Sequence, residues 1–99
     1  MINRKEIERL IAMELEDANK KHHPLFASDH EAYAVIKEEL EETEAELKKL
    51  FVYLSSVWHQ VKNDTKPTRD YRGMKIAAIR LIQEGIQVAA MCEKAQKVK

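Results

Sequence analysis

Apolar side chains recur along the middle of the chain at alternating steps of four and three residues. The members of this ladder are Ile36, Leu40, Thr43, Leu47, Leu50, Leu54, Val57 and Val61, with Thr43 as its one polar position. An average spacing of about 3.5 residues over so many turns is typical of a long helix whose apolar seam faces another helix. The ladder therefore predicts an all-α helical bundle with one long central helix.

The residues before and after the ladder predict where this helix begins and ends. Ser28 and Glu31 have the spacing of a capping box, in which Ser28 accepts a hydrogen bond from the Glu31 amide and the Glu31 carboxylate reaches back to the Ser28 amide. Turn-forming residues at 63–68, with Pro67 among them, stop the helix at its other end. We therefore expect a helix over residues 30–62.

A helix of this length is difficult for a small chain to cover. Residues 30–62 span about 50 Å, whereas a compact domain of this size has a radius of gyration of about 13 Å. Either the helix breaks, most simply at Ser55 and Ser56, or a second copy of the chain covers the exposed part of its apolar surface. We favour the second and expect a bundle completed by homo-oligomerisation.

Two further helices are expected on either side of the central one. The first covers about residues 5–20 and follows a capping pair formed by Asn3 and Glu6. The other begins between residues 68 and 74 and ends near residue 96; it is apolar nearly all round, which predicts burial on two sides. Cys92 lies in this apolar run and is expected to be a core residue. Only 2 glycines and 2 prolines favour helices, and 99 residues suffice for a single core, so we expect one helical domain over residues 1–99.

The charge balance narrows the classes of partner. Lysine and arginine total 17, aspartate and glutamate total 17, and the isoelectric point is about 6.9, which excludes the strongly basic surface of a dedicated nucleic-acid binder. The longest stretch without a formal charge, residues 50–61, is shorter than the about 20 residues that cross a bilayer. One cysteine and an N-terminus without a secretory leader favour the cytoplasm. We therefore expect neither a nucleic-acid polymer nor a membrane as partner.

Carboxylates are concentrated in the first half of the central helix. Residues 29–46 hold eight of them against one lysine. At about 100° per residue, three of the glutamates point away from the ladder and three border it. The first group is Glu38, Glu41 and Glu44, and the second is Glu39, Glu42 and Glu46. A solvated helix flank is one interpretation of the second group, and a site for a divalent cation is the other.

The last helix adds a second pair of oxygen-bearing side chains. Glu84 and Gln87 are three residues apart inside an apolar run, as Glu39 and Glu42 are on the central helix. A carboxylate in an apolar bundle needs a compensating partner, because an unpaired buried charge costs several kcal/mol. Arg80, one turn before Glu84, is one such partner, and a metal ion held between the two helices is another.

Both acidic elements occur in the order found in a known family. Residues 38–42 read Glu-Glu-Leu-Glu-Glu, and residues 84–87 read Glu-Gly-Ile-Gln. The chain resembles the MazG-like all-α nucleoside triphosphate pyrophosphohydrolases, whose signature is Glu-Glu-x-x-Glu followed by Glu-x-x-Asp. It is most similar to the small phage-encoded members, through HEAYAVIKEELEE at 30–42 and EGIQVAAM at 84–91.

The resemblance implies an activity, a cofactor and an assembly. Members of this family form dimers or tetramers, hold Mg²⁺ between helices and cleave a nucleoside triphosphate between its α and β phosphates, releasing the monophosphate and pyrophosphate; Mn²⁺ is an alternative ion. By position, the resemblance assigns Glu39, Glu42 and Glu84 as metal ligands and Glu38 or Glu42 as the carboxylate that assists catalysis. Gln87 takes the fourth metal position, where the family usually has an aspartate.

The substrate contacts are less constrained by the sequence. The chain has no glycine-rich phosphate loop, so phosphate binding depends on Mg²⁺ and on basic residues. The basic candidates are Lys66, Arg69, Arg72, Lys75 and Arg80, and the aromatic candidates for a nucleobase are Phe26 and Tyr33. The alternative function is a non-catalytic helical oligomerisation or interaction protein, related to the family but without its activity.

Overall fold

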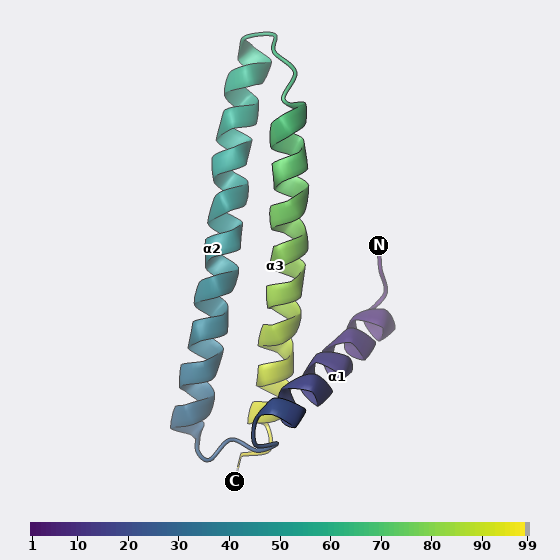
Figure 1. Cartoon of the computed structure of the whole chain (residues 1–99), viewed down its shortest axis with the longest axis vertical. Coiled ribbons are helices and arrows are strands. Elements are labelled where there is room, and N and C mark those ends of the chain that lie inside the picture. Colours follow the sequence, from purple (N-terminus) through teal and green to yellow (C-terminus); the bar gives the residue numbers. More distant parts are fainter. Residues whose placement is uncertain (99) are drawn as a thin grey trace.

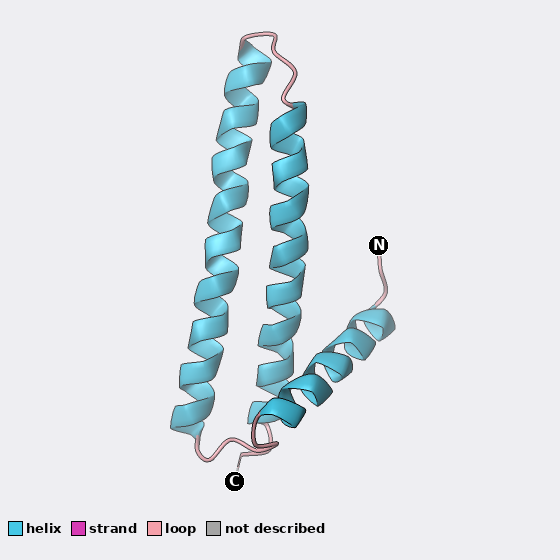
Figure 2. Cartoon of the chain, viewed as in Figure 1, coloured by secondary structure: helices cyan, strands magenta, loops and turns pink. Residues whose placement is uncertain are grey.

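The computed structural model describes residues 1–98 and consists of three helices (Figure 1). They are α1 (Arg4–Lys21), α2 (Asp29–Lys62) and α3 (Thr68–Ala95). Loops connect them, and Figure 2 shows no strand in this part of the chain. The prediction of an all-α fold is confirmed, and each helix boundary lies within one or two residues of the position that the sequence indicates.

The long central helix is continuous. α2 has 34 residues and passes through Ser55 and Ser56 without a break, so the broken-helix alternative is wrong. The hydroxyl of Ser56 donates to Oδ2 of Asp70 on α3 at 2.5 Å and thereby ties the two helices together. Asp64 turns the chain with a φ of 55°, after which α3 returns antiparallel to α2. The result is a hairpin that dominates a molecule of 58 × 27 × 20 Å.

The less exposed residues of α2 form a seam that faces α3. They are Ala32, Ile36, Glu39, Thr43, Glu46, Leu50, Tyr53, Val57 and Gln60, again at steps of four and three. This seam is rotated around α2 relative to the predicted ladder, because the one neighbouring helix, α3, covers only a narrow stripe of α2. Every second ladder member, namely Leu40, Leu47, Leu54 and Val61, is therefore exposed. A single chain therefore covers only part of the predicted ladder.

The packed core lies where α1 crosses the C-terminal half of α3. Ile11 of α1, Phe26 of the first loop and Ala90 and Met91 of α3 are buried together with Ala32 of α2. The backbone of α1 lies against α3 rather than α2, and the N-terminal end of α1 leans away from the hairpin (Figure 1). The far half of the hairpin consequently consists of two helices with no third layer.

Two local expectations are corrected. Ser28 accepts from the Glu31 amide at 3.2 Å, as predicted, but the Glu31 carboxylate accepts from the amide of Ala27 at 3.3 Å rather than from that of Ser28. Cys92 is exposed and not a core residue, because α1 and α2 cover other faces of α3 at this level.

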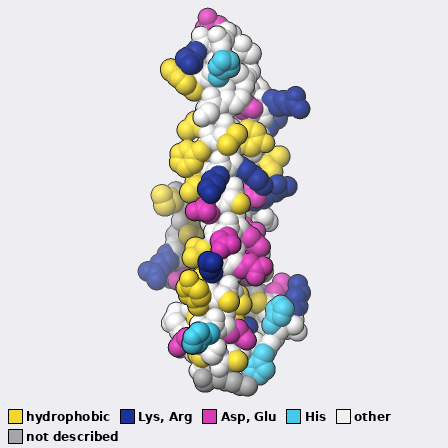
Figure 3. Space-filling view, turned by 90° about the vertical axis from the view of Figure 1, so that its left-hand side faces the viewer, with side chains coloured by type: hydrophobic (Ala, Val, Ile, Leu, Met, Phe, Trp, Pro, Cys, Tyr) yellow, Lys and Arg dark blue, Asp and Glu magenta, His cyan; other side chains and the backbone are white. Residues whose placement is uncertain are grey.

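The chain leaves an unusual amount of apolar surface uncovered. Its accessible surface is 7742 Å², whereas a compact monomer of this mass exposes about 5,800 Å². An exposed stripe runs along α2 through Leu40, Leu47, Phe51, Leu54, Trp58 and Val61, and we refer to it as the outer stripe. Figure 3, which looks at the molecule from the α2 side, shows hydrophobic side chains gathered in its upper half. No helix within residues 1–98 combines the length and apolar character needed to span a bilayer.

Candidate metal centre

Three of the predicted ligands come together between α2 and α3. Glu39 and Glu42 lie one turn apart on α2, and Glu84 faces them from α3. One carboxylate oxygen from each residue lies within 4.8 Å of those of the other two. Glu39 and Glu84 are half-buried, whereas Glu42 reaches the group from the exposed side. We refer to these three residues as the carboxylate cluster.

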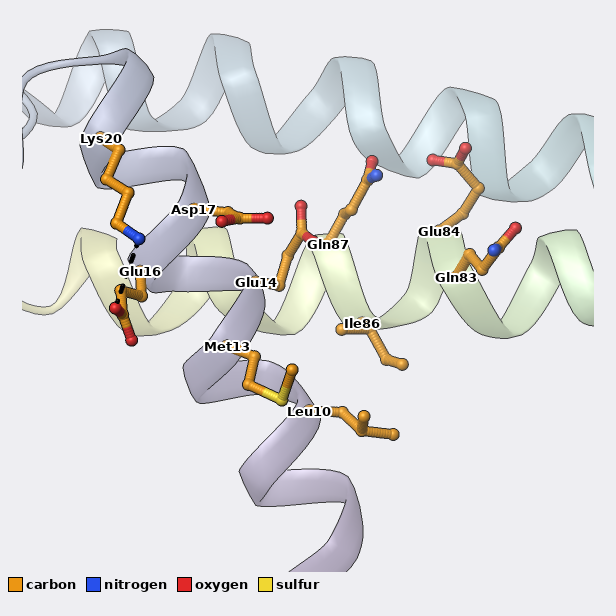
Figure 4. A pocket seen from close by; sticks show the side chains of 10 residues that line it. All are labelled: Leu10, Met13, Glu14, Glu16, Asp17, Lys20, Gln83, Glu84, Ile86 and Gln87. Atoms are coloured by element: carbon orange, nitrogen blue, oxygen red, sulfur yellow. Dashed lines mark ion pairs between the residues drawn. The ribbon is translucent and has the colours of Figure 1, made fainter.

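Gln87 lies beside the carboxylate cluster, as its sequence position predicts. Figure 4 shows Gln87 and Glu84 on α3 directed toward α2. Both groups that face the Gln87 amide are carboxylate oxygens, so its nitrogen is the atom that points at them. In this orientation it donates to Oε2 of Glu39 at 2.7 Å and to Oε2 of Glu84 at 3.3 Å. Gln87 therefore bridges the two half-buried carboxylates.

The close approach of these acids disfavours their ionised forms. Burial raises the pKa of Glu39 to about 7, and the neighbouring charges of Glu42 and Glu84 add to this effect. Burial also raises the pKa of Glu84, and its contact with Glu42 acts in the same direction. Loss of hydration is therefore the main cause of both shifts, and repulsion between the neighbouring carboxylates adds to it.

No basic side chain of residues 1–98 neutralises the charge of the carboxylate cluster. Within residues 1–98, every ion pair joins two residues three or four apart on one helix, and none involves Glu39, Glu42 or Glu84. Arg80 is exposed and is not paired with Glu84, so the structural ion pair considered from the sequence does not form. Glu41 and Glu44 instead bind lysines on their own helix, in agreement with the predicted solvent-facing group.

Glu46 extends the acidic environment by one more turn of α2. Its Oε1 accepts from Lys49 at 3.0 Å, while its Oε2 is buried without a hydrogen-bond partner in the described chain. Glu46 is not a member of the carboxylate cluster, whose three carboxylates are ligands of the type that hard divalent cations such as Mg²⁺ or Mn²⁺ take.

A groove of about 1000 Å³ leads away from the carboxylate cluster. Glu38, Glu39 and Gln87 line one part of it, and Phe26 and Lys94 line another. Glu38 is exposed, as predicted, and its carboxylate borders this open space. A smaller groove of about 560 Å³ lies between α1 and α3, where Glu14 and Asp17 point from α1 toward Gln87 (Figure 4).

The sequence interpretation missed Lys94. Its side chain is only 7% exposed, and its Nζ lies 4.6 Å from the centre of the Phe26 ring. Lys94 lies on the buried face of α3, three residues after Met91 and four after Ala90. Charged residues are rarely buried, so the pattern of the neighbours alone did not single it out.

The remaining predicted substrate residues are distributed unevenly around the site. Phe26 is buried in the wall of the larger groove, whereas Tyr33 is 69% exposed and does not line it. Five basic candidates are exposed and lie outside both grooves: Lys66, Arg69, Arg72, Lys75 and Arg80. Arg80 is one turn from Glu84, but Arg69 is about 22 Å away along α3 at the rise of an α-helix. A single chain therefore does not gather these cations around the carboxylate cluster.

Fold and site together define a helical-hairpin protein with an interhelical carboxylate cluster at the mouth of a groove. Comparisons with protein-family models, curated proteins and solved structures found no match to this chain.

Proposed function

We propose that the protein is a Mg²⁺-dependent nucleoside triphosphate pyrophosphohydrolase, with Mn²⁺ as an alternative ion. The observation that carries the proposal is the carboxylate cluster, which has no basic partner within residues 1–98 and opens onto a groove with an aromatic ring and an ammonium farther along it. Such a groove suits a ligand with a strongly anionic, metal-bound end and an aromatic end. A nucleoside triphosphate has this chemistry.

In the proposed reaction, water attacks the α-phosphorus, the bond from that phosphorus to the bridging oxygen breaks, and pyrophosphate leaves. Glu39, Glu42 and Glu84 would hold the ion, which supplies positive charge for the triphosphate when it is bound. Gln87 holds Glu39 and Glu84 in position through its amide nitrogen. Glu38 borders the groove outside the cluster, so its carboxylate is available to accept the proton of the attacking water.

We also propose that the active form is a homo-oligomer, with a dimer as its smallest unit. The surface exceeds that of a compact monomer by about 1,900 Å², and obligate dimers bury about 1,000–2,500 Å² per chain. The outer stripe of α2 supplies an apolar heptad pattern that suits helix-to-helix packing with a second copy. Nucleotides and free Mg²⁺ are both available in the cytoplasm, where we place this activity.

A second candidate function is a non-catalytic helical interaction protein. Two observations favour it: the extent of the outer stripe, and a neutral Gln87 donating to two carboxylates in place of a fourth acid. In this alternative the stripe serves assembly and the acids serve solubility.

One experiment separates the two functions. The full chain is incubated with a panel of ribo- and deoxyribonucleoside triphosphates and Mg²⁺, and the products are identified by phosphorus NMR. Monophosphate with pyrophosphate supports the proposed enzyme, and EDTA should stop their formation. Diphosphate with orthophosphate would contradict the proposed bond cleavage, and unchanged substrate across the panel would favour the interaction protein.

A further inference from the structure

The predicted ladder on α2 is covered along one edge only. Its members alternate between the seam that faces α3 and the exposed outer stripe. The seam members are Ile36, Thr43, Leu50 and Val57, and the exposed members are Leu40, Leu47, Leu54 and Val61. At about 100° per residue, the outer stripe lies about a quarter turn around α2 from the middle of the seam. An apolar stripe of this width accommodates a second neighbouring helix in addition to α3.

α3 has an apolar side that the rest of residues 1–98 does not cover. Gly73 lies against Tyr53 of α2, and Ala77, one turn later, is buried, so this side of α3 faces α2. Ala90 packs with Ile11 of α1 on another side. A third side lies about a quarter turn from Ala77 and consists of Tyr71, Met74, Ala78 and Ile82. Tyr71 and Ile82 are more than half exposed, so neither α1 nor α2 covers this side.

The uncovered sides of α2 and α3 form one surface. Because α3 runs antiparallel to α2, a quarter turn in the same sense of rotation about each helix leads to the same side of the hairpin (Figure 1). We refer to the outer stripe together with Tyr71, Met74, Ala78 and Ile82 as the free face. α1 lies on the other side of the hairpin, because Ala90, which packs with it, is rotated from Ala77 in the opposite sense. A two-helix layer with one apolar face is half of a four-helix bundle.

The charges beside the free face change sign along the hairpin. Residues 29–46 hold eight acids and one lysine, whereas residues 62–80, at the tip, hold six basic residues and two acids. A second hairpin that runs in the same direction would place like charges together at both ends. A hairpin that runs in the opposite direction places the basic tip of each copy beside the acidic segment of the other. Complementary charges fix the orientation of paired surfaces in this way.

We propose that the free face binds the free face of a second copy that runs in the opposite direction, so that two hairpins form an antiparallel four-helix bundle. The outer stripe extends from Leu40 to Val61, so its centre, at residues 50 and 51, lies at the twofold axis. Both grooves are bordered by α1, on the other side of the hairpin, and stay open in this arrangement.

The area of the free face agrees with a second copy as its partner. A single chain exposes about 1,900 Å² more than a compact monomer, which is of the size that each chain of an obligate dimer buries. This inference rests on the homodimer proposed above, to which it adds the contribution of α3 and the orientation of the two copies. It does not depend on the proposed hydrolysis.

Distances between spin labels test the orientation. The full chain receives Cys92→Ser and then either Lys37→Cys or Lys48→Cys, at two exposed lysines that each pair with a glutamate of α2. About the proposed centre, two labels at position 37 lie about 40 Å apart along the helices, and two labels at position 48 lie less than about 10 Å apart along them. Double electron–electron resonance should therefore give a clearly longer distance at position 37. Hairpins that run in the same direction would give similar distances at both positions.

Charges placed on two sides of α3 test which side is covered. Ile82→Lys puts a cation into the free face beside the basic tip of the second copy, and we expect the dimer to become about 100-fold weaker. Ile76→Lys is the matched control, because Ile76 is also more than half exposed and lies on the α1 side of α3; it should keep the mass of the parent. Light scattering at micromolar concentration measures the masses, and circular dichroism verifies that both variants are folded.

A long distance at position 37, a short one at position 48 and dissociation of Ile82→Lys alone would support the arrangement. Similar distances at the two positions would overturn the orientation, and equal masses of the two isoleucine variants would overturn the free face as the interface. A monomeric parent chain would overturn both this inference and the proposed homodimer. Hydrolysis is measured separately, since the expected distances in a chain that cleaves no triphosphate would refute the enzyme and leave the arrangement standing.

Discussion

The amide nitrogen of Gln87 lies 2.7 Å from Oε2 of Glu39, so a neutral side chain of α3 satisfies a carboxylate of α2 whose pKa is raised to about 7. The same amide donates to Glu84 at 3.3 Å. This donor explains how the metal-free chain tolerates two half-buried acids in contact, although no basic side chain of residues 1–98 pairs with them. An aspartate at this position would add a charge and remove the donor.

Gln87→Asp should therefore change stability and metal response in opposite directions. In EDTA we expect the variant to lose about 1–2 kcal/mol, or about 5–10 °C in Tm for a domain of this size, because a fourth anion joins the cluster. With excess Mg²⁺ its Tm should rise more than that of the parent, because hard cations respond to ligand charge. Gln83→Asp, on the exposed side of the same helix turn, controls for added charge alone. Equal metal responses in parent and variant would remove Gln87 from the site.

Glu39→Gln and Glu84→Gln should each lower Mg²⁺-dependent turnover by at least about 100-fold, because each removes an anionic ligand while keeping side-chain volume. The same substitutions should leave Tm in EDTA unchanged or higher, since they relieve repulsion within the cluster. Glu44→Gln is the control, because Glu44 is exposed and paired with Lys48. Steady-state kinetics and thermal melts on all three variants measure both effects. Similar turnover in the three variants would contradict the assignment of the cluster.

The raised pKa of Glu39 predicts the pH dependence of the metal-free chain. Between its ordinary value of 4.5 and about 7, the native state binds a proton that the unfolded state has released. The free energy of unfolding should therefore fall as pH rises through this window. Thermal melts in EDTA at about pH 5 and about pH 8 should show the higher Tm at the lower pH. Glu39→Gln should reduce this dependence, and a parent chain whose Tm rises over the window would contradict the prediction.

Much of the fold follows from local signals in the sequence. The caps at Asn3 and Ser28 accept the predicted amides, and the ladder predicts the length of α2. Which residues of α2 form the seam that faces α3 could not be predicted in the same way. Leu50 and Leu54 belong to one ladder, but α3 covers only the first of them. That choice depends on how α3 packs, which is a tertiary property.

The candidate site likewise has a part that local sequence signals predict and a part that depends on tertiary packing. The three-residue spacing within each helix predicted Glu39, Glu42 and Glu84 as ligands, and the antiparallel hairpin places them together. Lys94 was missed because its side chain packs against Phe26, which lies in the loop before α2. No spacing rule on α3 alone contains that contact.

The last prediction concerns the outer stripe of α2. Leu54 lies at its centre and is 50% exposed in the single chain, although its neighbours along the stripe are apolar. If a second copy covers this surface, Leu54→Glu places an unpaired charge in the interface, at a cost of about 3 kcal/mol or a more than 100-fold weaker dimer. Light scattering at micromolar concentration should show the parent as at least a dimer and Leu54→Glu as a monomer.

A matched variant isolates the effect of position from that of charge. Ala45 is exposed on the same helix, and nine residues at about 100° each place it on the side opposite Leu54. Ala45→Glu should keep the mass of the parent oligomer, because this face carries no apolar stripe. Helical content by circular dichroism should be similar in both variants, since neither side chain packs in the core of its own chain. A parent that is monomeric at this concentration and melts cooperatively would contradict the homo-oligomer, because the hairpin would then be stable with its apolar stripe in water.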